Sequence, residues 1–377
     1  MQIDQIKTDK SQFPLFYVVD WLPPDFGAVG QHALIEAKEI AAKGREVHLV
    51  GLTSGRPCVE SVDIDRASSK PLVIHKIKAK QYDKANFVGR LFWTISTNIR
   101  LVNVVLRHPN SFGADVLFTG SPPFMLYFVV ALKLFRKAKL MYRTTDLYPE
   151  VIIAHLGRRP PLLGWLERAT RLLRKTVERF EVQGEDQKAV LEQGGIPANR
   201  IEIKRYSAPV AIAGNEKPAP RPANLSGCKI LLYSGNYGIA HEVETVVQGL
   251  VLHRRNGGKF GLWLNATGQK ADQIEHRLID LQVPVARTPP VGLGDLPALL
   301  AAADAHLITL RSEFAGIVLP SKVYACILSG RPIIFVGPAS SDVHLLCTRA
   351  TQRYVRIEPG DPEGFARGLD ELSANSN

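Results

Sequence analysis

The chain has 377 residues, of which 45% are hydrophobic and 22% charged, and its formal net charge is +11. The composition is that of an ordinary globular protein, and the length exceeds what one core usually accommodates, so we expect two domains. The four cysteines are widely spaced without a C-x-x-C pair, which disfavours a disulfide framework or a zinc site and fits a reducing cytoplasm.

The positive charge is concentrated in one part of the sequence. Residues 76–181 contain 19 Lys and Arg against 7 Asp and Glu, whereas the rest of the chain is close to neutral. A localised basic field predicts an anionic partner, such as a nucleic acid, an acidic membrane leaflet or a phosphorylated substrate. A solvated surface with a high isoelectric point is the alternative interpretation.

The first half of the chain alternates apolar strand candidates with helical patterns. The helical pattern 32–44 ends at Gly44, and glycine is favoured at the carboxyl end of helices. This alternation predicts a parallel sheet covered on both faces. The strand candidates are 13–20, 45–52, 71–78, 114–120, 139–146, 179–184 and 200–206.

Residues 208–227, rich in Ala and Pro and without periodicity, are typical of a linker. A second strand and helix alternation follows, so we expect a first Rossmann-like domain over 1–207, a second over 228–360 and a terminal helix over 361–377. The predicted class is therefore α/β, with two Rossmann-like domains facing each other across a cleft and ligands beyond the carboxyl ends of the strands. The second set of strand candidates is 229–235, 261–268, 283–287, 305–310 and 331–338.

Two features of the first half are candidates for a site. Gly27 and Gly30 lie between a strand and a helix, where their main chain could approach a ligand, although a tight connection explains them equally well. Asp146 ends the strand candidate 139–146, and a carboxylate there can accept a proton from an attacking hydroxyl. The alternative is an Asp that caps the following turn.

The second half carries glycine turns at successive strand ends, followed by a helix start at Pro320-Ser321-Lys322. Ser can cap a helix, and Lys adds positive charge at an end that attracts anions. The segment is either an ordinary helix start, with the helix running to Gly330, or a phosphate site. Because several such features lie where one nucleoside diphosphate would need them, we favour a donor site that includes Gly235, Asn236, Tyr237, Gly238, Gly268, Gly316, Ser321 and Lys322.

Taken together, these motifs resemble the two-domain glycosyltransferases of the GT-B fold, in particular the family 4 group of bacterial polysaccharide and glycan biosynthesis enzymes. The matching segments fall in the family's order over nearly the whole chain. They are 22–50, 120–124, 144–150, 191–203, 233–247, 294–310 and 316–337.

The resemblance implies that the second domain binds a nucleotide-sugar and the first domain an acceptor. It implies that Ser321 and Lys322 contact the donor diphosphate and that Gly268 and Arg287 lie near the nucleotide. It also implies that Gly27 and Gly30 lie close to the transferred sugar.

The chain departs from the family at two glutamates that many members carry eight positions apart. Aligned on Gly316 and Pro320, these positions hold Ala315 and Val323, and Glu313 is offset by two. The departure leaves open which sugar is transferred and whether its anomeric configuration is retained. It also supports an alternative function, a catalytically inactive relative that acts as a binding or accessory subunit.

The expected reaction is transfer of a sugar to a hydroxyl of a membrane-associated glycan acceptor, which a lipid diphosphate could carry. Asp146 is the candidate base and Lys322 the group that stabilises the leaving diphosphate. We expect no metal ion and no cofactor, since no cluster of Glu, Asp and His is apparent, and no nucleic-acid partner, since no nucleic-acid-binding motif is present.

The basic part of the chain contains two stretches, 84–108 and 158–180, that combine an apolar strip with Arg and aromatic residues. Such stretches suit an anionic bilayer surface. The polar N-terminal residues show no signal peptide, and we expect a cytoplasmic protein bound peripherally to the inner face of the plasma membrane. A helix that faces the core with a solvated basic side is the alternative.

Overall fold

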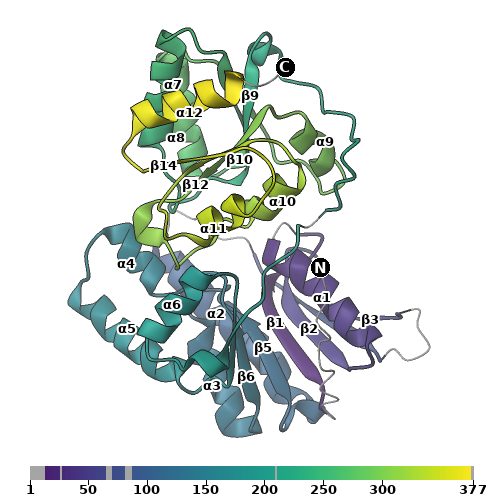
Figure 1. Cartoon of the computed structure of the whole chain (residues 1–377). Coiled ribbons are helices and arrows are strands. Elements are labelled where there is room, and N and C mark those ends of the chain that lie inside the picture. Colours follow the sequence, from purple (N-terminus) through teal and green to yellow (C-terminus); the bar gives the residue numbers. More distant parts are fainter. Residues whose placement is uncertain (1–12, 26–27, 65–69, 81–86, 209, 375–377) are drawn as a thin grey trace. The chain divides into compact units, whose positions relative to one another are not determined.

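The computed structural model describes residues 13–25, 28–64, 70–80, 87–208 and 210–374. The chain forms two compact units, which are described separately below (Figure 1). Unit 1 comprises 1–150, 159–182 and 191–204, and unit 2 comprises 151–158, 183–190 and 205–377. Two short segments that precede residue 207 in the sequence therefore group with the second unit.

Unit 1 is built on an eight-stranded sheet with the order β3-β4-β2-β1-β5-β6-β7-β8. All neighbouring strands are parallel except β3 and β4, so the predicted parallel sheet is confirmed. The strands are β1 Leu15–Trp21, β2 Val47–Thr53, β3 Cys58–Val62, β4 Leu72–Lys78, β5 Asp115–Thr119, β6 Lys139–Arg143, β7 Arg179–Val182 and β8 Ile201–Ile203.

The sequence analysis missed β3, because this edge strand is largely exposed and lacks the apolar pattern that identifies buried strands. The central strands are buried along most of their length, and α1 packs on β1 and β2 to form one core of the unit. The helices of unit 1 are α1 Ala28–Ala42, α2 Phe87–Arg107, α3 Met125–Arg136 and α5 Pro161–Arg174, whereas α4 Glu150–Leu156 and α6 Glu185–Gln193 group mostly with unit 2. No helix in the described part of the chain is long and apolar enough to cross a membrane.

Unit 2 is built on a six-stranded, all-parallel sheet with the order β11-β10-β9-β12-β13-β14. The five predicted strands are present, and the sequence analysis missed the edge strand β14, which has only four residues and is partly buried. The strands are β9 Lys229–Asn236, β10 Phe260–Thr267, β11 Val285–Thr288, β12 Ala305–Thr309, β13 Ile333–Val336 and β14 Tyr354–Ile357.

The helices of unit 2 cover both faces of its sheet. The predicted terminal helix forms α12, and its Phe365, Leu369 and Leu372 are buried in a core shared with α7 and α8. Apart from the 3-10 helix Ala223–Leu225, the described residues of the predicted linker are irregular, but Ala219 and Leu225 pack against the other face of the same sheet. The helices are α7 Glu244–Arg255, α8 Gln269–Asp280, α9 Leu296–Ala301, α10 Lys322–Leu328, α11 Asp342–Thr348 and α12 Pro362–Ala374.

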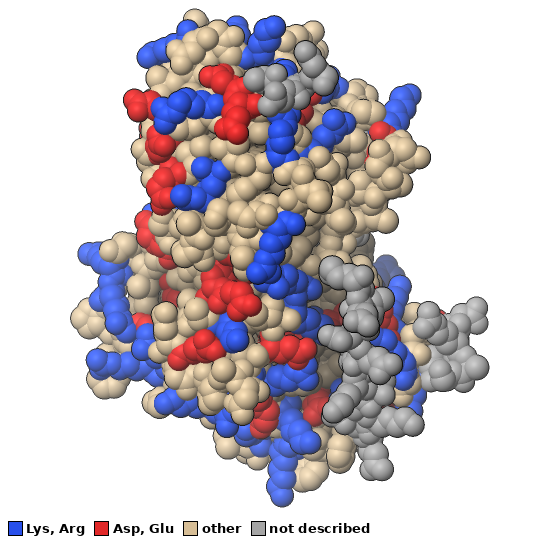
Figure 2. All heavy atoms as spheres, in the orientation of Figure 1, with Lys and Arg blue, Asp and Glu red and all other residues tan. Residues whose placement is uncertain are grey.

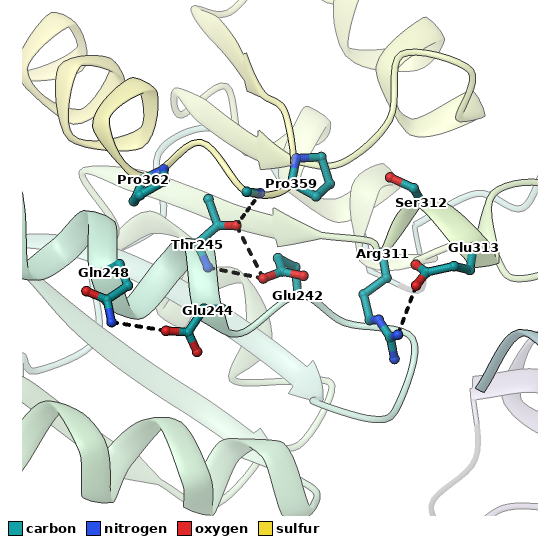
Figure 3. A pocket seen from close by; sticks show the side chains of 10 residues that line it. Glu242, Glu244, Thr245, Gln248, Arg311, Ser312, Glu313, Pro359 and Pro362 are labelled. Carbon is teal, nitrogen blue, oxygen red and sulfur yellow. Dashed lines mark hydrogen bonds and ion pairs between the residues drawn. The ribbon is translucent and has the colours of Figure 1, made fainter. Parts of the chain in front are cut away.

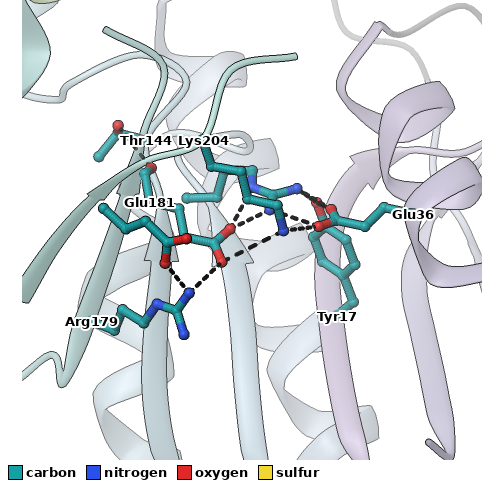
Figure 4. A network of polar contacts seen from close by, with 8 residues as sticks. Tyr17, Glu36, Thr144, Arg179, Glu181 and Lys204 are labelled. Carbon is teal, nitrogen blue, oxygen red and sulfur yellow. Dashed lines mark hydrogen bonds and ion pairs between the residues drawn. The ribbon is translucent and has the colours of Figure 1, made fainter. Parts of the chain in front are cut away.

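A buried ionic network ties α1 of unit 1 to three strands (Figure 4). Arg143 of β6 donates to Glu36 of α1, to Glu181 of β7 and, over 2.8 Å, to the hydroxyl of Tyr17 on β1. The side chain of Arg143 is only 3% exposed. The pKa of Glu36 is lowered to about 2, because the contacts with Arg143 and Lys204 outweigh the opposing effect of burial.

Replacement of Arg143 by Met should destabilise unit 1, because two largely buried carboxylates lose their main partner. We expect a loss of about 3–5 kcal/mol in the free energy of unfolding, measured by urea denaturation at pH 7. The exposed Arg168→Met on α5 is the matched control and should change stability little. If Arg143→Met and the wild-type protein unfolded with the same midpoint urea concentration, this role would be contradicted.

The same network should make stability sensitive to acid. The pKa of Glu36 in the folded protein lies below its ordinary value of 4.5, so its contribution is fully present above pH 4.5 and is lost as the pH falls toward 2.

Candidate functional site

The carboxyl end of β9 in unit 2 carries the glycine turn that the sequence analysis singled out. Gly235 has a φ of 115°, and Tyr237 is fully buried with its ring stacked on that of Tyr233 at 4.2 Å. A Cβ on Gly268 would lie 2.6 Å from the carbonyl oxygen of Tyr237, so the turn after β10 lies directly against this turn. Asn236 and Gly238 complete the turn, and Asn236 is exposed.

Lys322, the first residue of α10, reaches the same turn. Its ammonium nitrogen is buried, lies 3.1 Å from the ring centroid of Tyr233 and has no hydrogen-bond partner among the described residues. A Cβ built on Gly235 would be 3.8 Å from this nitrogen. Burial without a counter-ion lowers the pKa of Lys322 well below its ordinary value. The structure therefore brings together Lys322 and Gly235, two of the predicted donor residues.

Ser321 precedes α10 but does not cap it. Its backbone is helical and its side chain makes no capping hydrogen bond, so the suggested capping role is wrong. The hydroxyl is therefore not committed to the helix start. The helix is also shorter than expected, since it ends at Leu328 and Gly330 has a φ of 66°.

Arg287 and Gly316, two further predicted donor residues, have contacts that differ from those of Lys322 and Gly235. Arg287 is on β11, two strands from β9, and its guanidinium pairs with Asp272 and Glu275 of α8. Gly316 has a φ of 70°, and a Cβ there would lie 2.8 Å from the carbonyl oxygen of Asp186. Both residues therefore have contacts within unit 2 that account for their positions without a ligand.

A cavity of about 550 Å³ in unit 2 was not anticipated from the sequence (Figure 3). Within it, Glu242 accepts from the N–H and hydroxyl of Thr245, and Arg311 donates to Glu313 over 3.0 Å. None of the predicted donor residues lines it. The lining residues come from the segments that follow β9, β12 and β14, including the first turns of α7 and α12, and only the order of the strands brings these segments together. They are Glu242, Glu244, Thr245, Gln248, Arg311, Ser312, Glu313, Pro359, Gly360 and Pro362.

In unit 1, the carboxyl edge of the sheet carries two carboxyl groups. Burial raises the pKa of Asp146, which follows β6, to about 6. Asp20 at the end of β1 has a pKa raised to about 6, chiefly by burial. The sequence analysis missed Asp20, although it ends the strand candidate 13–20 in the same manner as Asp146 ends 139–146.

Gly30 lies in the first turn of α1 rather than in the preceding loop, and Gly27 lies outside the described residues. A Cβ on Gly30 would overlap the main-chain carbonyl of Trp21. Close packing of α1 on the end of β1 therefore requires glycine at this position.

Gly30→Ala should lower the thermal midpoint of unit 1, because the overlapping atom belongs to the main chain and cannot move aside. We expect a cost of about 1–3 kcal/mol. In the control Gly164→Ala on α5, the new Cβ meets nothing closer than the Arg159 Nε at 3.8 Å. Gly164→Ala should leave the thermal midpoint unchanged or raise it. Equal thermal midpoints for Gly30→Ala and Gly164→Ala would refute the steric requirement.

Comparison with known proteins gives a consistent class. No protein-family model matches the sequence. The chain is 22% identical over 272 residues to the probable glycosyltransferase WbjE of Pseudomonas aeruginosa, covering 68% of this chain and 66% of that protein. It is 29% identical over 142 residues to the putative colanic acid biosynthesis glycosyl transferase WcaI of Escherichia coli K12, covering 37% and 34%. The chain thus spans about two thirds and one third of the lengths of these relatives.

Solved structures resemble nearly the whole chain. Sucrose-phosphate synthase from Thermosynechococcus elongatus aligns with a TM-score of 0.69 at 11% identity, covering 97% of this chain and 90% of that one. HepE from Anabaena, in complex with UDP and glucose, aligns with a TM-score of 0.61 at 9% identity, covering 97% and 90%. The α,α-trehalose-phosphate synthase from Burkholderia vietnamiensis aligns with a TM-score of 0.63 at 11% identity, covering 96% and 91%.

These neighbours are glycosyltransferases of the GT-B fold, which contains two Rossmann-like domains. The chain has this fold, and the predicted α/β class is confirmed. The resemblance to glycosyltransferases of bacterial polysaccharide biosynthesis is also confirmed, since both curated relatives are named as glycosyltransferases.

Proposed function

We propose that this chain is a glycosyltransferase that moves a sugar from a nucleoside-diphosphate donor to a hydroxyl of a glycan acceptor. The observation that carries the proposal is the buried ammonium of Lys322, which lies beside the β9 glycine turn without a hydrogen-bond partner. A buried cation of this kind is costly unless an anion binds to it. The relatives' names, and the UDP and glucose in the HepE complex, support a nucleotide-sugar as that anion.

The proposed donor site lies at the carboxyl edge of unit 2. Main-chain groups of residues 235–238 would approach the diphosphate, and Ser321 would supply a hydroxyl. As the bond from the anomeric carbon to the diphosphate breaks, its electron pair remains on the diphosphate oxygen. Lys322 stabilises this growing charge, which is the point at which preorganised donors contribute most to catalysis.

Asp146 is the proposed base in unit 1. A carboxyl group with a pKa near 6 is mostly ionised at neutral pH and is more basic than an ordinary Asp. It would accept the proton that the acceptor hydroxyl loses as its oxygen bonds to the anomeric carbon. The proposed reaction needs no metal ion or cofactor.

Lys322→Ala should lower turnover at saturating donor by about ten- to a hundredfold, because a charge-assisted contact contributes roughly 1.5–3 kcal/mol. Release of nucleoside diphosphate measures this, with the donor chosen by thermal-shift screening of UDP-, GDP- and TDP-sugars. The exposed Lys259→Ala on unit 2 is the control and should turn over normally. Near-normal turnover of Lys322→Ala would remove its leaving-group role.

The same assay tests the second candidate function, a catalytically inactive accessory subunit. The absence of the paired glutamates at Ala315 and Val323 favours that candidate. An accessory protein would show a thermal shift with a nucleotide-sugar but would release no nucleoside diphosphate with any acceptor.

We further propose that the acceptor is membrane-associated, with a lipid diphosphate as its carrier, and that unit 1 binds an anionic bilayer peripherally on the cytoplasmic side. The amino-terminal half of α2 exposes an apolar face formed by Leu91, Phe92, Ile95 and Ile99. Exposed Arg90 and Arg100 flank it. This arrangement suits an interfacial helix with cations at the level of the lipid headgroups.

Helix α5 adds exposed apolar side chains, with Trp165 71% and Leu162 79% exposed, beside the exposed Arg168 and Arg171. Lys and Arg side chains are numerous on the face of unit 1 that Figure 2 shows. The carboxyl-terminal half of α2 does not take part, because Val102 and Val105 are buried. For the carboxyl-terminal half of α2, the alternative interpretation of a helix that faces the core is therefore correct.

The bilayer proposal predicts that the protein sediments with vesicles of mixed anionic and zwitterionic lipid at low salt and less so at high salt, since screening weakens charge attraction. Phe92→Ser combined with Trp165→Ser should reduce sedimentation severalfold. Ile279→Ser, at a 57% exposed position on α8 of unit 2, is the control and should not. Failure of the wild-type protein to sediment would contradict peripheral attachment.

A further inference from the structure

We propose that binding of the donor in unit 2 is coupled to the uptake of a proton, because the side chain of Lys322 is an uncharged amine in the empty site and an ammonium ion once a diphosphate lies beside it. The inference rests on the proposed function. It deepens that function by making the affinity for the donor depend on pH and by identifying the group that takes up the proton.

The amino group of Lys322 is enclosed by side chains that offer it no counter-ion. Its nitrogen is buried, lies 3.1 Å from the ring centroid of Tyr233 and has no hydrogen-bond partner among the described residues. The ring of Tyr237 stacks on that of Tyr233 at 4.2 Å. Both tyrosine hydroxyls donate to main-chain oxygens, Tyr233 to Asn236 and Tyr237 to Glu242. The amine therefore faces an aromatic ring rather than an anion.

The ionisable groups on α10, on β12 and before α7 supply no negative charge to this amine at neutral pH. Burial raises the pKa of the Cys326 thiol on α10 to about 12, so this thiol is uncharged. Burial lowers the pKa of His241, which precedes α7, to about 3. Burial lowers the pKa of His306 on β12 to about 3 as well. Both imidazoles are therefore neutral.

Helix α11, which packs on α10, adds two further ionisable groups. Asp342 pairs with Arg205 over 3.0 Å, and burial raises the pKa of the Cys347 thiol to about 12. Of the described residues, Cys326 is the one whose ionisation would affect the pKa of Lys322, and that thiol is uncharged at neutral pH. The described part of unit 2 therefore provides no counter-ion for a charged Lys322.

The balance of interactions in the empty site favours the uncharged amine. Attraction to the face of the Tyr233 ring replaces only part of the hydration that a buried ammonium ion loses. A buried amine without a counter-ion gives up its proton instead. Burial accordingly lowers the pKa of Lys322 well below its ordinary value of 10.5.

A bound diphosphate reverses this balance. The phosphate groups of a nucleotide-sugar are ionised at neutral pH, and a negative charge within about 4–6 Å of an amine raises its pKa. The β9 turn leaves room for such a group, since a Cβ on Gly235 would already lie 3.8 Å from the Lys322 nitrogen.

In the proposed step, the lone pair of the Lys322 amine accepts a proton from the solvent as the donor binds. The ammonium ion then donates to a phosphate oxygen. The proton returns to the solvent when the nucleoside diphosphate leaves, so this step consumes no proton over a complete turnover.

Isothermal titration calorimetry measures the coupling directly. The probe is whichever UDP-, GDP- or TDP-sugar gives the largest thermal shift, and titrations at pH 8.5 in two buffers of different ionisation enthalpy give the number of protons taken up. The wild-type protein should take up about one proton per bound donor. The exposed Lys259→Ala should do the same, whereas Lys322→Met should take up none. Undiminished uptake by Lys322→Met would assign the proton to another group and overturn the proposal.

The affinity of the wild-type protein gives a second readout, which remains available if Lys322→Met binds the donor too weakly for calorimetry. Because protonation and binding are linked, the Kd should rise about tenfold per pH unit between pH 8 and pH 9. The guanidinium of Lys322→Arg keeps its proton, so the Kd of that variant should not change over this range. A constant Kd for the wild-type protein would overturn the proposal.

Stability tests the empty site without any ligand. The pKa of Lys322 in the folded protein lies below its ordinary value of 10.5, so the stability that its neutral form contributes is fully present above pH 10.5 and is lost as the pH falls. Urea denaturation should therefore show the wild-type protein losing stability relative to Lys322→Met between pH 10.5 and pH 8.5. A difference in stability that stays constant with pH would overturn the uncharged amine.

Donor binding separates the two possible failures. If no nucleotide-sugar binds to the wild-type protein, the proposed function and the proton coupling both fail. If a nucleotide-sugar binds to the wild-type protein without proton uptake, the proton coupling alone fails.

Discussion

Parallel strand pairing is the constraint on which both units depend. Parallel strands need a crossover between them, and the crossover helices cover the faces of each sheet. The faces of the central strands are therefore occupied by apolar packing, as in β2 and β12, whose residues are all buried. Polar side chains that contact a ligand therefore lie at the carboxyl edge of each sheet, where strands end and loops begin.

The structure distinguishes buried charges that hold the fold from those available for chemistry. Arg143 is completely satisfied by Glu36, Glu181 and Tyr17, and it fastens a helix to three strands. The amino group of Lys322 is also buried, yet it has no hydrogen-bond partner among the described residues. An unsatisfied buried group costs stability, and a ligand that supplies the missing partner recovers that free energy on binding.

The candidate site residues of the two units differ in chemical type: unit 2 has a basic residue and unit 1 has acidic residues. Unit 2 presents a buried lysine beside glycine turns, which suits a departing diphosphate, and unit 1 presents carboxyl groups, which suit removal of a proton. The apolar face of α2 and the arginines beside it lie on the same unit as these carboxyl groups.

The sequence by itself determined the α/β class, the two-part organisation and the buried strands, and it singled out the helix start at Lys322 as a candidate site. Apolar runs such as those of β1 and β9 identify buried strands, and Pro-Ser-Lys before a helical pattern is a local signal. The sequence could not reveal the edge strands β3 and β14, the cavity lined by Glu242 and Arg311, or the contact between Asp20 and Ser121. Local pattern carries no information on strand order, and only tertiary pairing of β1, β5 and β6 brings together residues more than a hundred positions apart.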